Sequence, residues 1–296
     1  MLICLNGGLG NQIGNYVFGQ FLIEKGIDVE FVFSDNVNDA RAIVLDRFNV
    51  DLTPAKKETI EKFLFEKPGA KQVSTLFTKN IFDKIWRNNL WNFLKRIRAE
   101  YAVYPKKTPF LLSKIVSYKD VLKYGCRVGA VCDCYSPIPE FNDEKFKEKM
   151  QKQLTLKEPL DEKNNQILKM IKNAKNPVGV HIRRGDFIDF KFPVVKSEFL
   201  IEKMEYMMKT LMEPEFFIFS NGMDWAKETL KDFNNVHFVD INDEAHGYLD
   251  FVLFNECIHR IYSNSTFSLW ARYLNRHKEG FEFYPDENDM QVEEKA

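Results

Sequence analysis

The sequence predicts an α/β protein built on largely parallel sheets, and three observations support this. Between residues 178 and 275, short apolar runs alternate with segments of helical periodicity, the pattern of a doubly wound parallel sheet. The first 35 residues show the same alternation as a βαβ unit. Because 296 residues are more than one core usually holds, we expect two domains, residues 1–176 and 177–296.

In the N-terminal domain, an apolar strand at residues 2–5 is expected to end at a glycine turn. A helix at 11–25 that stops at Gly26 and a strand at 29–33 complete the βαβ unit. Pro177 favours a boundary because the residue before a proline rarely stays helical. Three further helices are expected ahead of it, at 78–101, 142–156 and 161–174.

In the C-terminal domain, each apolar run predicts a buried strand and each amphipathic stretch a helix. The strands are expected at 178–182, 216–220, 236–239 and 260–263. The helices are expected at 197–211, 225–231, 247–257 and 265–275. The tail after Asp286 is acidic, and we expect it to be frayed.

Composition excludes some classes of partner. Lys plus Arg number 42 and Asp plus Glu 43, a net charge of −1, so nucleic acid is not expected as a partner. Five cysteines without paired zinc spacing predict reduced structural thiols. With no leader and no run of the ~18 apolar residues that span a bilayer, we expect a cytoplasmic protein.

The predicted helix at 78–101 combines an apolar stripe with many basic residues. One interpretation is a surface helix that contacts anionic lipid at the inner membrane face. The other is an amphipathic helix packed on the core with a solvated basic face.

The first candidate ligand segment is residues 7–12, which contains Gly8, Gly10 and Asn11. Glycines let a backbone approach a ligand closely, and the following helix start attracts anions. A dinucleotide fingerprint would need glycine in place of Ile13. The segment therefore predicts either a ligand contact or a tight turn.

The second candidate segment is residues 181–186, which begins with His181. Adjacent arginines at a strand end are costly in a core, and a guanidinium fork matches phosphate. Alternation sends Arg183 and Arg184 to opposite faces, so we expect Arg183 to bind phosphate and Arg184 to form a structural ion pair. The alternative for Arg183 is an ion pair with Asp186.

The third segment, residues 263–268, precedes an amphipathic helix. Its hydroxyls and backbone N–H groups predict either an anion nest or an N-cap without a ligand. Upstream, Asp250 is alone in an apolar helix and needs hydrogen-bond donors. A guanine base offers two, and the alternative is a backbone or arginine partner.

Several signatures are absent from the sequence. No Asp-x-Asp pair for a metal–diphosphate complex occurs, and neither does a phosphate-binding loop with Gly-Lys-Ser/Thr, a Gly-x-Ser-x-Gly elbow or a His-Glu-x-x-His motif. Arginine and a helix terminus can stabilise a diphosphate leaving group without Mg²⁺. We therefore expect no metal and no cofactor.

Together these segments resemble the α-1,2-fucosyltransferases of glycosyltransferase family 11. The resemblance also includes residues 217–220 with Trp225, and residues 248–257. It implies a two-domain GT-B fold with Rossmann-like parallel sheets, an acceptor-side N-terminal domain and a GDP-sugar-binding C-terminal domain. It also implies inverting, metal-independent transfer of L-fucose from GDP-β-L-fucose to a galactoside hydroxyl, in synthesis of a bacterial surface polysaccharide or O-antigen.

The resemblance also implies roles for residues of this chain. Arg183, Asp186 and His181 would be catalytic, with Arg183 on the diphosphate and Asp186 or Asp189 as the base. Asp250 would recognise guanine. The other donor-binding residues would be Gly8, Gly10, Asn11, Ser220, Asn221, Ser265, Thr266 and Phe267. Asn221 and Gly222 depart from the family pattern, which often has two aspartates there.

Two other functions fit parts of the sequence. The glycine-rich first turn and Asp35 after the second strand resemble an NAD(P)-dependent reductase, which would leave the arginine pair unexplained. A non-catalytic module that binds nucleotide sugars or glycans is the other. The sequence leaves the acceptor and the oligomeric state open.

Overall fold

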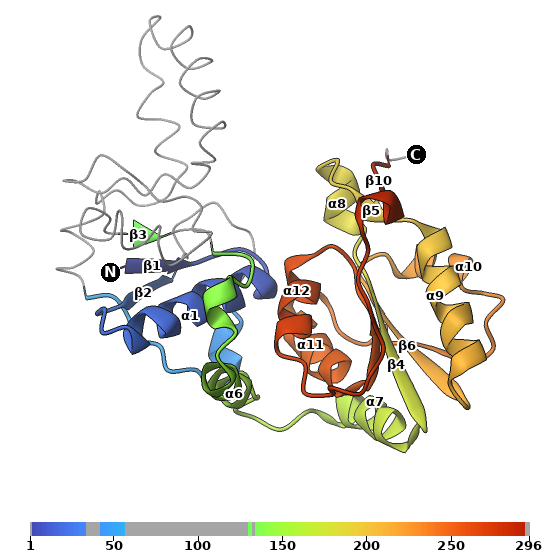
Figure 1. Ribbon diagram of the computed structural model, residues 1–296, viewed down its shortest axis with the longest axis horizontal. Coiled ribbons are helices and arrows are strands. Elements are labelled where there is room, and N and C mark those ends of the chain that lie inside the picture. Colours follow the sequence, from blue (N-terminus) through green and yellow to red (C-terminus); the bar gives the residue numbers. More distant parts are fainter. Residues whose placement is uncertain (1, 34–41, 57–129, 132–133, 294–296) are drawn as a thin grey trace, which may run out of the picture. The chain divides into compact units, whose positions relative to one another are not determined.

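The computed structural model describes residues 2–33, 42–56, 130–131 and 134–293 (Figure 1). The chain forms two units, Met1–Thr155 and Leu156–Ala296. Helix α7 (Glu162–Asn173), which we expected before the boundary, is in the second unit because it packs against α11 (Gly247–Glu256). The predicted helix at 78–101 and Asp35 lie outside the described residues.

The first unit contains the predicted βαβ arrangement. Strands β1 (Leu2–Leu5) and β2 (Glu30–Phe33) are parallel neighbours, joined through α1 (Leu9–Glu24), and β1 also pairs in parallel with β3 (Ala130–Val131). Helix α1 begins two residues earlier than predicted because Gly8 adopts the extended N-cap conformation. Further along lie η1 (Leu45–Arg47), η2 (Pro139–Phe141) and α6 (Glu144–Gln153).

The core of the first unit lies around α1, which is buried along most of its length. Phe21 makes edge-to-face contacts with Phe141 and Phe146, with ring centroids 5.3 and 5.8 Å apart. At Gly19 a Cβ would lie 2.6 Å from the Phe31 ring. Only glycine lets the helix approach β2 this closely.

The second unit contains a five-stranded parallel sheet in the order β7-β6-β4-β8-β9. In chain order of these strands the pattern is 3-2-1-4-5, the Rossmann arrangement, which confirms the predicted doubly wound sheet. Its strands are β4 (Asn176–Ile182), β6 (Pro214–Ser220), β7 (Val236–Phe238), β8 (His259–Ile261) and β9 (Glu282–Phe283).

Helices cover both faces of this sheet (Figure 1). Helices α9 (Ser197–Thr210) and α10 (Met223–Thr229) lie on one face, where Val178, Val180 and Ile182 of β4 join the core. Helices α11 and α12 (Thr266–Tyr273) lie on the other, which Gly179 and His181 face. Cover on both faces explains why β4 is almost entirely buried.

The expectation of a frayed tail after Asp286 is wrong for residues 287–293. The helical turn η4 (Glu287–Asp289) is closed by a capping box, and β10 (Met290–Gln291) pairs antiparallel with β5 (Val194–Val195). Beyond β10, Glu293 forms an ion pair with Arg184. These contacts give hydrogen-bond and ion-pair partners to the polar groups of this segment. Its acidic composition alone predicts that these groups stay in solvent.

Candidate functional site

The candidate residues of the second unit follow two neighbouring strands. Residues 183–186 come directly after β4, and residues 263–268 come shortly after β8. The strand order reverses between β4 and β8, and in open parallel sheets ligands bind beyond the carboxyl ends of the strands at such a point. Ser220, at the end of β6, pairs in register with Ile182 on the other side of β4.

Arg183 and Asp186 form an ion pair at this edge. Nη2 of Arg183 donates to Oδ2 of Asp186 at 2.7 Å, and the Arg183 guanidinium lies 5.7 Å from the centroid of the Phe187 ring. Asp186 lies in α8 (Gly185–Asp189), a short helix that the sequence patterns missed. Both side chains remain about a quarter exposed, so the pair is within reach of a ligand.

Asn221 connects this pair to the strand ends. Its Nδ2 donates to Oδ1 of Asp186 at 3.2 Å, and its Oδ1 accepts a hydrogen bond from the backbone N–H of Arg184 at 2.8 Å. At Gly185 a Cβ would lie 2.7 Å from Asn221 Nδ2, so the glycine makes room for the amide. Asn221 therefore holds one oxygen of the Asp186 carboxylate and Arg183 holds the other.

Arg184 forms the structural ion pair that we expected, with Glu293 as its partner. Its Nη1 donates to Oε1 of Glu293 at 3.2 Å, and its Nη2 contacts Oε2. The guanidinium also lies 3.8 Å from the centroid of the Trp225 ring, a close cation–π contact. Arg184 is buried, so its charge needs both partners.

His181 is buried and links β4 to the start of α12. Its Nδ1 lies 2.9 Å from Oγ of Ser263 and 2.8 Å from Oγ of Ser268, and its ring stacks on Phe267 with centroids 4.3 Å apart. Burial, and to a lesser extent the charge of Arg183, lowers the pKa of His181 to about 3. The imidazole is therefore neutral at ordinary pH.

The segment before α12 provides the cap that the sequence predicted as one alternative. Oγ of Ser265 accepts a hydrogen bond from the backbone N–H of Ser268 at 3.2 Å. Thr266 and Phe267 occupy the first helical turn, where backbone N–H groups have no partner within the helix. These N–H groups give the helix start the donors that an anion requires.

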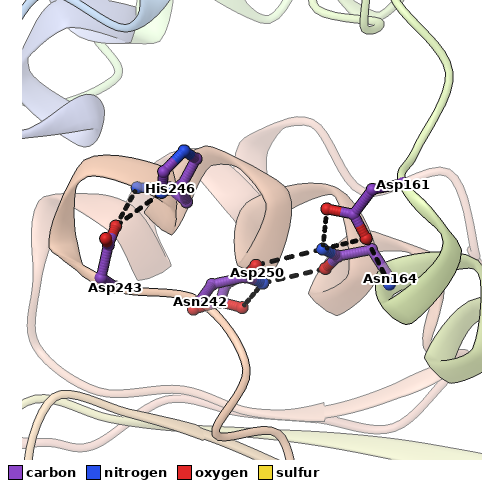
Figure 2. Close-up of polar contacts among 6 residues, drawn as sticks. All are labelled: Asp161, Asn164, Asn242, Asp243, His246 and Asp250. Atoms are coloured by element: carbon purple, nitrogen blue, oxygen red, sulfur yellow. Dashed lines mark hydrogen bonds and ion pairs between the residues drawn. The ribbon is translucent and has the colours of Figure 1, made fainter.

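Asp250 lies on α11 and accepts a hydrogen bond from the side chain of Asn242, which was not among the expected partners. Nδ2 of Asn242 lies 2.7 Å from Oδ1 of Asp250 (Figure 2). The pKa of Asp250 is raised to about 7, chiefly by burial; the hydrogen bond from Asn242 opposes the rise and the charge of Asp240 contributes to it. The carboxyl is therefore poised between its two protonation states near neutral pH.

The sequence patterns did not identify three residues of this region: Asn164, Asn242 and Glu293. Asn164 is almost fully buried on an amphipathic helix, and an amide at such a position is the one signal that could have indicated a partner. Asn242 lies in the loop between β7 and α11 and Glu293 after β10, and neither position has a pattern that indicates a role.

Gly8, Gly10 and Asn11 belong to the first unit. Gly8 is the N-cap of α1, and its carbonyl accepts a hydrogen bond from the backbone N–H of Asn11 at 2.9 Å. Gly7 has φ +72°, and a Cβ there would lie 2.5 Å from Asn11 Nδ2. The segment is a tight glycine turn, and a ligand contact by it stays a prediction.

Within the described ranges, no group of three or more His, Cys, Asp or Glu side chains is arranged to hold a metal ion. Metal independence stays a prediction. Cys134 and Cys257 are buried free thiols. No helix in the described part of the chain has the length and apolar character needed to span a bilayer.

Solved structures share the architecture of this chain. Fucosyltransferase NodZ from Bradyrhizobium is 10% identical, with 100% of this chain and 99% of that chain covered and a TM-score of 0.52. NodZ alpha-1,6-fucosyltransferase soaked with GDP-fucose is 12% identical over the same shares, with a TM-score of 0.50. At this identity the likeness shows the fold, the two-domain α/β fold of GT-B glycosyltransferases.

The family follows from the sequence. The family model described as Glycosyl transferase family 11 matches residues 124–288, more than half of the chain, and the protein belongs to this family. Galactoside alpha-(1,2)-fucosyltransferase 1 of Saimiri boliviensis boliviensis is 31% identical over 141 residues, 44% of this chain and 38% of the relative. The same protein of Leontocebus fuscicollis is 31% identical over 44% of this chain and 39% of its own length. The chain thus spans about two fifths of these relatives.

Proposed function

We propose that the protein transfers L-fucose from GDP-β-L-fucose to a galactoside hydroxyl of a glycan and forms an α-1,2 linkage. Membership of family 11 and the activity in the relatives' names support transfer of fucose and the linkage. The single observation that favours it most is the position of Arg183 and the α12 start, which follow the two strands at the switch point of a Rossmann sheet. A guanidinium and a helix start at that position suit a diphosphate.

The proposed reaction is a single displacement. The acceptor oxygen forms a bond to the anomeric carbon of fucose while the bond from that carbon to the GDP oxygen breaks, so the β-linked donor gives an α-linked product. GDP leaves with the electron pair, and Arg183 with the first-turn N–H groups of Thr266 and Phe267 stabilises its developing charge. The acceptor proton passes to a carboxylate, Asp186 or Asp189.

The geometry around Asp186 bears on its role as base. Arg183 and Asn221 both donate to this carboxylate, on Oδ2 and Oδ1 respectively, and these two bonds fix its direction. In the proposed complex, the diphosphate draws Arg183 away from Asp186 and frees Oδ2 to accept the proton. His181 is neutral and bonded to two serine hydroxyls, so we assign it the support of the α12 start rather than proton transfer.

We propose that Asp250 recognises the guanine base of the donor. Its carboxylate can accept from the ring N–H and the exocyclic amino group, whereas adenine presents an acceptor at the ring position. Ser220, Asn221 and Ser265 would complete the donor site of this unit. A donor contact by Gly8, Gly10 and Asn11 remains a prediction from the sequence.

The acceptor that we propose is part of a bacterial surface polysaccharide such as O-antigen. The protein would act in the cytoplasm, in peripheral contact with the inner membrane through residues 78–101. The basic amphipathic sequence of that segment supports this.

The experiment that tests the function is a transfer assay with GDP-fucose and a set of β-galactosides, with EDTA present. Mass spectrometry of the products should show the addition of one deoxyhexose, and NMR should identify an α-1,2 linkage. Binding of GDP-fucose without transfer to any galactoside would favour a non-catalytic module. Binding of NAD(P) but no guanine nucleotide would overturn the proposal.

A further inference from the structure

A chain of side-chain hydrogen bonds leads from helix α7 to Asp250 (Figure 2). Asn164 and Asn242 form a reciprocal amide pair, with Nδ2 of Asn164 donating to Oδ1 of Asn242 at 3.1 Å and the reverse bond at 2.9 Å. On one side of the pair, Asn164 Nδ2 also donates to both oxygens of Asp161, at 3.1 and 3.0 Å. On the other side, Asn242 Nδ2 donates to Asp250 Oδ1. We call these four residues the amide relay.

The relay uses every amide hydrogen that the two asparagines have. Each Nδ2 carries two hydrogens. In Asn164 one is directed to the Asp161 carboxylate and the other to Asn242. In Asn242 one is directed to Asn164 and the other to Asp250. A flip of either amide would bring a carbonyl oxygen against a carboxylate, so the relay has one favourable orientation.

The orientation is set at the α7 end. Asp161 is the N-cap of α7, and its Oδ1 accepts the backbone N–H of Asn164 at 2.9 Å. That backbone hydrogen bond, with the side-chain bond from Asn164, lowers the pKa of Asp161, so the carboxylate is ionised and can only accept. Asn164 must therefore present Nδ2 to Asp161 and Oδ1 to Asn242.

Asn164 is also fixed in place. It is 1% exposed, where α7 packs against α11. Burying an amide costs free energy unless its hydrogen bonds are made, and both amide hydrogens of Asn164 have acceptors. Asn242, by contrast, lies in a loop and is partly exposed, so its own surroundings restrain it less.

We propose that Asn164 is a positioning residue for base recognition: it fixes the Asn242 amide so that Asp250 is held by Oδ1 and keeps Oδ2 for a purine N–H. This proposal rests on the proposed function. Among the described residues Oδ2 of Asp250 has no hydrogen-bond partner, whereas Oδ1 has Asn242. Without Asn164 the Asn242 amide loses its second partner, so the direction in which it holds Oδ1 of Asp250 is no longer fixed.

The ligand class follows from this chemistry. A carboxylate oxygen accepts from a base with a ring N–H, as in guanine or hypoxanthine, and is repelled by the ring nitrogen of adenine, which is itself an acceptor. Asn164 should therefore affect the preference for GDP and IDP over ADP. It should leave the part of the affinity that comes from the diphosphate unchanged.

The test compares Asn164→Leu with a matched control in the same helix turn. Asn165 has the same side chain, but its Nδ2 donates to the backbone carbonyl of Leu160, outside the relay. The dissociation constants of GDP, IDP and ADP are measured calorimetrically for the wild type, Asn164→Leu and Asn165→Ala. If Asn164→Leu does not fold, Asn242→Ala is measured in its place, because Asn242 lies in a partly exposed loop.

We expect Asn164→Leu to weaken GDP and IDP about tenfold, the loss typical of a hydrogen bond to a charged group, with ADP unchanged. Asn165→Ala should keep the wild-type ratio of GDP to ADP affinity. If the wild type discriminates but Asn164→Leu or Asn242→Ala discriminates equally well, the positioning role is wrong and the proposed function stands. If the wild type itself does not distinguish GDP from ADP, both are overturned.

Discussion

Nδ1 of His181 lies 2.8 Å from Oγ of Ser268, and this contact joins the end of the central strand to the first turn of α12. The same Ser268 hydroxyl accepts the backbone N–H of Ser263 at 3.0 Å. The position of the α12 start, and with it the proposed phosphate site, therefore depends on a neutral imidazole. Four predictions follow from this and related contacts.

The buried His181 should make the protein sensitive to acid. Its folded pKa, about 3, lies below the unfolded value of ~6.5, so its contribution is complete above pH 6.5 and is lost as the pH falls. Between pH 7.5 and 5 this group should reduce the free energy of unfolding by about 2 kcal/mol. Urea unfolding of the wild type and His181→Asn at both pH values measures it. An equal loss in the variant would contradict the assignment.

Arg183→Ala should lower turnover of GDP-fucose at least a hundredfold, because it removes the cation that we place on the leaving diphosphate. Arg183→Lys should recover part of the loss, since the charge remains but the fork does not. Arg47→Ala is the control for loss of an arginine, because Arg47 is an exposed residue of the first unit. Near-wild-type turnover in Arg183→Ala would remove Arg183 from the mechanism.

The affinity for GDP-fucose should rise with pH around neutrality. Because burial raises the pKa of Asp250 to about 7, the carboxylate that accepts from guanine is lost as the pH falls through 7. Between pH 8 and 6 the dissociation constant should increase roughly tenfold, the change in the ionised fraction of a group with that pKa. The donor diphosphate is esterified at both ends, so it does not titrate in this range. Asp250→Asn should bind GDP-fucose weakly, with an affinity that does not change with pH. If the affinity of this variant still changes steeply with pH, another group is responsible for the titration.

Glu293→Gln should lower the free energy of unfolding by about 2 kcal/mol, because among the described residues the guanidinium of the buried Arg184 then keeps the Trp225 ring and a neutral amide oxygen but no counter-charge. This loss of stability is smaller than that expected for a fully buried ion pair, because Glu293 is partly exposed. Glu228→Gln breaks an exposed pair with Lys231 and should cost much less, because water screens both charges. Chemical denaturation of both variants tests the contrast, and equal losses would contradict it.

Much of the fold could be predicted because the sheet of the second unit is covered on both faces. The apolar runs at 178–182 and 216–220 are confirmed as β4 and β6, since buried parallel strands are apolar throughout. The elements that were not predicted are short: α8 has one turn, and β3, β5, β9 and β10 have two residues each. Segments of that length show no periodicity.

The site was predictable only where its residues are close in the sequence. The cap of α12 by Ser265 is confirmed because a cap and its partner lie three residues apart. The partners Asn164 and Asn242 are 78 positions apart, and Arg184 and Glu293 are 109 apart. Such pairs arise from topology, which brings distant segments together without a local pattern.

The ion pair of Arg184 with Glu293 has a consequence for biosynthesis. A ribosome adds residues in order, so Arg184 is made 109 positions before its counterion. Until β10 is translated and joins β5, the nascent second unit has a guanidinium without its carboxylate. The second unit therefore cannot neutralise Arg184 before residue 293 has been made, and a chain whose translation stops before that residue is the form that we expect a chaperone or protease to recognise.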